Sequence, residues 1–353
     1  MSSVSVATRV SHAQVVAQYN GALKRRLAWI GVLVLLLAAG VVLDLMTGPA
    51  GLSLAEIIDG LFGAEGSTFG VIMWQVRLPT ALLAVLIGAS LSLAGAEMQT
   101  ILHNPLGSPF TLGVSSAAAF GAALAIVLGV TVPLVPLTMA VPVNAFTLAF
   151  GSVMLIQAIA LLRQGAMPLV LFGIALVFGF NALVAVIQFI APADSLQQLV
   201  FWTMGSLNRA DTTSVLTMAI VFALVVPFSM RAAWSLTLLA LGEERAQSLG
   251  VHPRWLRFSC LLRASLLSAI AVAFAGTIGF VGLVGPHIAR LLVGEDHRFF
   301  LPASILAGAA VMSFSSIAAK VLLPGVLLPI GIVTSLVGLP FFVALLLSGK
   351  DVR

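Results

Sequence analysis

The stretch LAWIGVLVLLLAAGVVL, residues 27–43, decides the fold class, because it contains neither a charged residue nor a proline. A membrane-spanning helix needs roughly 20 mainly apolar residues, whereas the strands of a membrane barrel alternate polar and apolar positions. The whole chain continues this pattern. Of its 353 residues, 60% are hydrophobic and 8% are charged, and the mean hydropathy is +1.15. Since about a quarter of a soluble domain is charged, the sequence predicts an all-α polytopic membrane protein.

Apolar runs separated by charge, proline or glycine predict about ten transmembrane helices. We expect them at residues 28–47, 78–101, 112–132, 143–162, 168–191, 213–232, 256–276, 280–293, 300–319 and 331–348. Two shorter helices are expected outside these spans, one amphipathic at 53–63 and one within 193–211. Residues 1–27 precede the first span as a polar arm that is a candidate for disorder.

The distribution of basic residues predicts the orientation, since Lys and Arg gather on the cytoplasmic side of a membrane protein. With the N-terminus inside, all but three of the 17 Lys and Arg residues fall at or near the cytoplasmic face. The exceptions are Arg77, Arg209 and Lys320. An even number of spans then places both termini, including the tail at 349–353, in the cytoplasm. The same rule accounts for the net charge of +5 without a nucleic-acid partner.

Several kinds of chemistry are absent from the sequence. None of the lysines, Lys24, Lys320 and Lys350, lies in a G-x-x-x-x-G-K-[ST] phosphate-binding loop. The five histidines do not show the spacing of metal ligands, and Cys260 is the only cysteine. We therefore predict a protein that is not an enzyme, with no catalytic residue and no bound cofactor or metal.

One carboxylate falls well inside a predicted span. Glu97 lies in the inner half of the second span, and an ionisable residue at that depth can serve as a proton site. The chain would then be a proton-coupled secondary transporter. The favoured alternative is structural, with Glu97 hydrogen-bonded to a neighbouring helix or reaching the inner surface. Asp44, at the outer end of the first span, is expected at the membrane interface.

Six stretches, in order, resemble the permease subunits of binding-protein-dependent ABC importers for iron–siderophore complexes, haem and cobalamin, the FecCD-type family. They are RLPTALLAVLIGASLSLAGAEMQ (77–99), NPLGSPFTLGVSSAAAFGAAL (104–124), FWTMGSL (201–207), LGEERAQSLGV (241–251), GTIGFVGLVGPHIARLLVGEDHRFFLP (276–302) and LPIGIVTSLVGLPFF (328–342). The resemblance implies a type II ABC importer permease in the bacterial inner membrane, with a transmembrane domain over 28–348. It implies a dimer with a second copy or a paralogue, and a mostly apolar pathway lined by the second, fifth and tenth spans.

The resemblance also implies a substrate and a source of energy. A ferric siderophore is favoured over haem, and haem over cobalamin. A periplasmic binding protein would deliver the substrate, and ATP and Mg²⁺ would bind to a cytoplasmic ATPase partner. Within the polar loop 233–255, the family forms a coupling helix that fits a cleft of that ATPase, although an ordinary polar loop remains the alternative. The matching residues are Gly242, Glu243, Glu244, Arg245, Ala246, Leu249 and Gly250.

Two further sites are implied by the resemblance. Arg77 and Lys320 match outer basic positions that pair with glutamates of the binding protein, while an interface anchor is the alternative for Arg77. Thr80 stands where the family often has a second arginine, which reduces the docking charge. Asn104 and Pro105 match a loop that closes the pathway toward the cytoplasm, and a tight helix connection is an equal alternative.

Overall fold

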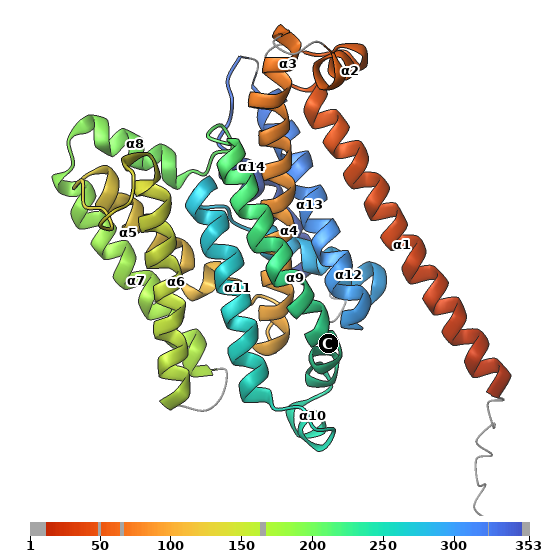
Figure 1. Cartoon of the computed structure of the whole chain (residues 1–353). Helices are drawn as coiled ribbons and strands as arrows, with labels where there is room; N and C mark the ends of the chain where they lie inside the picture. Colours follow the sequence, from red (N-terminus) through yellow and green to blue (C-terminus); the bar gives the residue numbers. More distant parts are fainter. Residues whose placement is uncertain (1–11, 49–50, 64–66, 163–166, 324, 348–353) are drawn as a thin grey trace, which may run out of the picture.

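The structure is a computed structural model that describes residues 12–48, 51–63, 67–162, 167–323 and 325–347, and every regular element in these ranges is helical (Figure 1). The helices are α1 (His12–Met46), α2 (Leu54–Phe62), α3 (Thr68–Ile72), α4 (Leu78–Ile101), α5 (Val114–Ile126), α6 (Ala140–Leu162), α7 (Met167–Ile190), α8 (Ala193–Thr203), α9 (Thr212–Ala240), α10 (Glu243–Ser248), α11 (Pro253–Ala275), α12 (Val281–Val293), α13 (His297–Val321) and α14 (Ile330–Leu347). A π-helical turn, Met73–Arg77, joins α3 to α4.

The ten expected spans correspond to helices of the structure, which confirms the all-α polytopic fold. Among the described residues, seven helices are long and apolar enough to cross a membrane. Three shorter apolar helices are α5, α12 and the part of α14 from Ile330 to Pro340. The third span was expected at 112–132, but α5 ends at Ile126. Gly129 follows with a left-handed φ of +64°, and Pro133 and Pro136 come next. These residues end the helix early because they do not continue regular helical geometry.

Helix α4 forms the centre of the bundle, and α9, α11, α12 and α13 pack around it (Figure 1). Small residues make this close packing possible. A Cβ atom on Gly95 would lie 1.8 Å from the carbonyl oxygen of Gly282 on α12. A Cβ atom on Gly88 would lie 2.3 Å from that of Gly308 on α13. These glycines therefore set the distance between the backbone of α4 and its two neighbours.

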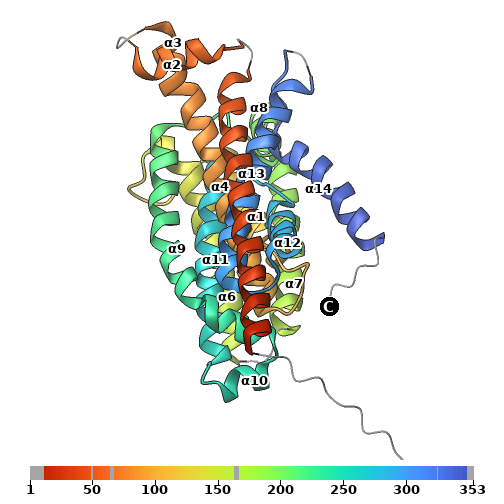
Figure 2. The ribbon, with the colours of Figure 1, turned by 90° about the vertical axis from the view of Figure 1, so that its right-hand side faces the viewer.

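The described part of the N-terminal arm, residues 12–27, is helical, whereas the whole arm was a candidate for disorder. Helix α1 begins at His12 and continues without interruption into the first span. Residues between 12 and 27 include Ala, Gln, Leu, Lys and Arg, which favour helix, so the span extends into the arm. Figure 2 shows α1 along the outside of the bundle. Residues 1–11 and the tail at 349–353 lie outside the described residues.

The two ends of the bundle carry different short helices. At one end, α2 confirms the amphipathic helix expected at 53–63, and its N-terminus has a capping box in which Ser53 and Glu56 hydrogen-bond reciprocally. Hydrogen bonds from Ser53 hold the pKa of Glu56 below its ordinary value. At the opposite end lies α10, on the side where α1 begins (Figure 1). By the positive-inside rule, the end of the bundle that carries α10 is the cytoplasmic end.

Candidate coupling and translocation site

Helix α10 projects from the cytoplasmic end of the bundle between α9 and α11 (Figure 1). Gly242 and Gly250 flank it with φ values of +115° and +83°, a region that favours glycine. Ala246 is fully buried and holds the helix against the bundle, whereas Leu249 is 63% exposed. The sequence therefore folds into a short helix with a sharp backbone turn at each end, anchored through one small side chain.

An apolar groove of about 440 Å³ lies beside α10. Trp255, at the start of α11, lines the groove and is 70% exposed, and Trp234 on α9 is also exposed. Large apolar side chains gathered at one solvent-facing place are typical of a contact surface for lipid or protein. The rest of the lining is Ser235, Leu238, Leu249, Gly250, Val251, His252, Leu256 and Ser259.

One guanidinium group joins α10 to the end of α4. Arg257 on α11 donates through Nη1 and Nη2 to the two carboxylate oxygens of Glu243, at 3.3 and 2.5 Å. Its Nε donates to the main-chain oxygen of Ile101 at 3.3 Å. Glu243 lies in the first turn of α10, where a negative charge is favourable, and Ile101 is the last residue of α4, where a positive charge is favourable. This ion pair, between the first turn of α10 and α11, was not expected from the sequence.

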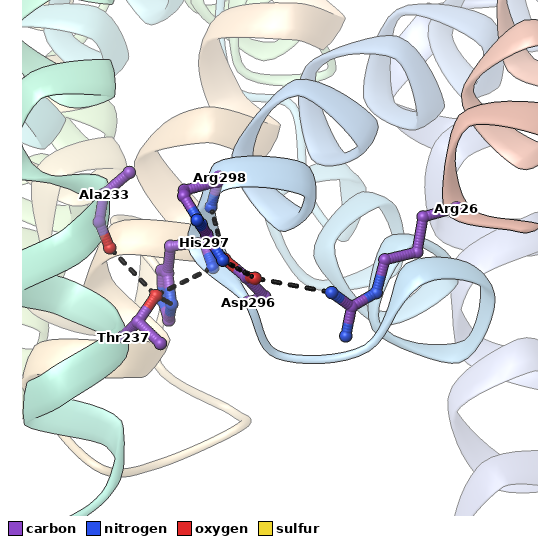
Figure 3. A network of polar contacts seen from close by, with 6 residues as sticks. All are labelled: Arg26, Ala233, Thr237, Asp296, His297 and Arg298. Atoms are coloured by element: carbon purple, nitrogen blue, oxygen red, sulfur yellow. Dashed lines mark hydrogen bonds and ion pairs between the residues drawn. The ribbon is translucent and has the colours of Figure 1, made fainter. Parts of the chain in front are cut away.

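A second polar network lies where α13 begins (Figure 3). The ring of buried His297 approaches two hydroxyl groups, with Nε2 at 2.7 Å from Oγ1 of Thr100 on α4 and Nδ1 at 3.3 Å from Oγ1 of Thr237 on α9. The main-chain N–H of His297 also donates to Thr237, at 3.0 Å. Asp296 beside it accepts from Arg298 at 2.7 Å and from Arg26 of α1 at 3.3 Å. Hydrogen bonds from Arg298 hold the pKa of Asp296 below its ordinary value.

A cavity of about 620 Å³ lies among the helices of the bundle. Its described lining contains hydroxyl and apolar side chains and no charged residue. The lining comes from α4, α5, α8, α11, α12, α14 and the segments between helices around them, but α7, the fifth expected span, contributes none of it. The hydroxyl-bearing residues are Ser108, Thr111, Ser115, Thr203, Ser268, Thr277 and Ser335.

Phe280 is a cavity residue that the sequence analysis missed. Its φ of +66° is unusual for a residue with a bulky side chain. Its side chain lies against α14, where a Cβ atom on Gly338 would come within 2.3 Å of the Cβ of Phe280. The strained backbone places an aromatic ring between the start of α12 and α14, on the wall of the cavity. The sequence signal was the glycine-rich run around it, GTIGFVG, which lies between the seventh and eighth expected spans and begins one of the stretches that carry the family resemblance.

Two of the outer basic residues, Arg77 and Lys320, lie in the protein interior rather than on an open surface. Lys320 donates to Oδ1 of Asp44 at 2.7 Å, and the two side chains are 10% and 0% exposed. Arg77 is 6% exposed and donates to the carbonyl oxygen of Thr47. We expected Asp44 at the interface and the two cations available for docking. Instead, the fold brings together α1, α13 and the π-helical turn, so that a buried carboxylate is paired with Lys320.

The turn at 103–109, which we name the gate turn, is closed by its own hydrogen bonds. Oδ1 of Asn104 accepts from the N–H of Leu106 at 2.9 Å, and the carbonyl of Asn104 accepts from the N–H of Gly107. Asn104 and Pro105 are half-buried. His103 has a left-handed φ of +46°. This geometry is that of a tight helix connection, and the gating role of Asn104 and Pro105 stays a prediction.

Glu97 is buried and paired. Its carboxylate lies 3.0 Å from Nη2 of Arg263 on α11, and Nε of the same arginine donates to it at 3.0 and 3.2 Å. The exposed fraction of the Glu97 side chain is 1%. Nη2 of Arg263 also lies 3.1 Å from Sγ of Cys260. The arrangement agrees with the structural interpretation, a carboxylate bound to a neighbouring helix.

Comparison with known proteins places this arrangement in a family. The FecCD transport family model matches residues 35–348. A probable iron chelatin transport system permease protein of Helicobacter pylori is 39% identical, over 83% of this chain and 87% of that protein. The hemin transport system permease protein of Yersinia pestis is 36% identical, over 80% and 86%. The vitamin B12 import system permease protein of Klebsiella pneumoniae is 35% identical, over 93% and 96%.

The fold gives the same result. A solved structure, described as an inward-facing conformation of a metal-chelate type ABC transporter, aligns with a TM-score of 0.79 and 33% identity, over 91% of this chain and 99% of that chain. Sequence and fold agree along almost the whole length of the described bundle. The chain therefore belongs to the FecCD transport family, as the multi-pass membrane permease of an ABC importer.

Proposed function

We propose that this permease imports an iron chelate, with a ferric siderophore as the first candidate. The uncharged cavity of about 620 Å³ carries this proposal. A bulky chelate shields its metal, so the pathway needs apolar surface and hydroxyl groups rather than charged ligands that would hold the metal. Haem and cobalamin are the alternatives within the same family.

The energy for transport is proposed to enter at α10. Glu243, Glu244 and Arg245 extend from the cytoplasmic end with Leu249, and Ala246 anchors them to the bundle. A separate ATPase that binds ATP and Mg²⁺ would contact this surface and the adjacent apolar groove. A second permease subunit and a periplasmic binding protein would complete the importer in the bacterial inner membrane. Docking of that protein through Arg77 and Lys320 stays a prediction, and would involve residues that are buried here.

The substrate is tested in proteoliposomes that contain the permease, its ATPase and its binding protein. Uptake of a radiolabelled ferric hydroxamate or catecholate is compared with uptake of haem and cobalamin at equal concentration. We expect ATP-dependent accumulation of the ferric siderophore above the other two. Preferential accumulation of haem or cobalamin would replace the proposed substrate and leave the assignment as an importer intact.

The coupling site is tested with the double variant Glu243→Lys/Gly250→Pro. Reversal of the charge at the first turn and loss of the left-handed residue after α10 both disturb the proposed ATPase surface. We expect loss of the ATPase from the purified complex and loss of ATP-driven uptake. If assembly and uptake both survive, α10 is not the coupling helix.

The function from a different class, a proton-coupled carrier that uses Glu97, is not supported by the geometry. It requires Glu97 to exchange protons with water, but the buried carboxylate is held by Arg263 at 3.0 Å. Uptake driven by a proton gradient without ATPase, and abolished by Glu97→Gln, would support this alternative against the importer.

A further inference from the structure

We infer that the coupling loop, residues 233–255, acts on the gate turn through two separate polar links, with Arg257 and His297 as the positioning residues. The Arg257 link joins Glu243 to Ile101, and the His297 link joins Thr237, through the main-chain N–H of His297, to Thr100, through the ring. This inference rests on the proposed coupling role of α10. It adds a physical route from that helix to the inner end of α4.

The Arg257 link is rigid because it uses three donor atoms of one planar group. Two donors engage the carboxylate of Glu243 and the third engages the carbonyl of Ile101. A fork of this kind fixes the orientation as well as the distance of its partners. The guanidinium side chain is 13% exposed. A displacement of the first turn of α10 therefore reaches the end of α4 through one side chain.

The His297 link reaches the same place from the other side of the loop. Thr237 lies in the last turn of α9, which leads directly into α10. Its hydroxyl donates to the carbonyl of Ala233 and accepts from the main-chain N–H of His297 (Figure 3). The Thr100 hydroxyl donates to the carbonyl of Ala96, so the ring proton of His297 lies on Nε2 and is donated to Thr100. Nδ1 then carries no proton, and the hydrogen bond to Thr237 is the one from the main-chain N–H of His297.

The two links end on consecutive residues. Thr100 and Ile101 are the last two residues of α4, and the gate turn follows after Leu102. The His297 link starts at Thr237, before α10, and the Arg257 link starts at Glu243, in the first turn of α10. Both links therefore hold the end of α4 that leads into the gate turn. Energetic coupling between distant sites is carried by contacts of this kind when they connect rigid elements. The geometry assigns transmission, rather than ATPase binding, to Arg257 and His297.

The test separates transmission from assembly. In a Cys260→Ser background, which removes the only cysteine of the chain, Leu106→Cys places a thiol on the gate turn, where the native side chain is 41% exposed. The complete complex is treated with a membrane-impermeant maleimide, with and without ATP and vanadate. The labelling rates, ATP hydrolysis, and uptake per ATP hydrolysed are measured for Arg257→Gln and Thr237→Val.

We expect each variant to retain the ATPase and to hydrolyse ATP within about twofold of the native rate. The nucleotide-dependent change in labelling and the uptake per ATP should each fall roughly fivefold, within the range for residues along a coupling network. Arg257→Lys keeps the charge without the fork and should restore only part of the loss. Thr217→Val is the matched control, because Thr217 on α9 is half-buried and its hydroxyl donates to the carbonyl of Thr213 within the same helix.

Two results would overturn the inference. The first is native labelling and native uptake per ATP in both Arg257→Gln and Thr237→Val. The second is loss of the ATPase from Arg257→Lys and Thr237→Val alike, which would assign the residues to assembly. If the native complex fails to import the chosen siderophore, the substrate proposal fails alone, because the labelling experiment needs only nucleotide.

Discussion

Removal of either partner of the Glu97–Arg263 pair should destabilise the fold strongly. The side chains are 1% and 11% exposed and three N···O contacts of 3.0 to 3.2 Å join them. Loss of one partner leaves the other charge buried, which costs about 3 to 5 kcal/mol. The small exposure of Arg263 gives it some access to water, so we expect about 3 kcal/mol for Glu97→Leu.

The free energy of unfolding can be measured in mixed micelles of increasing SDS content, with the fluorescence of Trp202, which is 1% exposed, among the signals. The double variant Glu97→Leu/Arg263→Leu is the control, because apolar replacement of both partners of a buried pair is often neutral. We expect it to recover to within about 1 kcal/mol of the native value. A loss of less than about 0.5 kcal/mol in the free energy of unfolding of Glu97→Leu would refute this reasoning, and so would a double variant as unstable as Glu97→Leu.

Two further changes test the packing and the outer ion pair in the same assay. Gly95→Ala should cost about 2 kcal/mol, because its Cβ would lie 1.8 Å from the carbonyl oxygen of Gly282. Gly151→Ala, with no atom within 4 Å of its Cβ, should be neutral or slightly stabilising. If Gly95→Ala and Gly151→Ala lowered the free energy of unfolding equally, close packing at Gly95 would not be the cause. Lys320→Met should destabilise the fold by about 3 kcal/mol because the Asp44 carboxylate stays buried. Addition of Asp44→Asn should restore most of that loss, and no restoration would show that the pair is not the cause.

The helices could be predicted from the sequence because each depends on its own residues. Uninterrupted apolar runs marked the spans, and the pattern that starts at Ser53 marked α2. The boundaries moved where local chemistry was overlooked. The helix-forming residues of the arm carry α1 back to His12, and the left-handed Gly129 ends the third span early. These shifts concern only residues close in sequence.

The pairing of polar residues could not be predicted, since it depends on which helices become neighbours. Asp44 and Lys320 are 276 residues apart, and Glu97 and Arg263 are 166 apart. Each was judged from its own span, which placed Asp44 and Lys320 at the surface. The hydrophobic periodicity of a span does not show which carboxylate and which cation on distant helices come into contact. The same reason applies to Arg257, which was counted only as a cytoplasmic charge.

The central claim is that this permease imports its substrate only when a separate ATPase acts on it. The most direct measurement is the uptake of a ferric siderophore into proteoliposomes that contain the permease and binding protein with no ATPase, with active ATPase, or with ATPase unable to hydrolyse ATP. We predict accumulation only with active ATPase and ATP, and unchanged ATP dependence in a folded Glu97→Gln variant. Accumulation without ATPase that follows a proton gradient and disappears in Glu97→Gln would contradict the account.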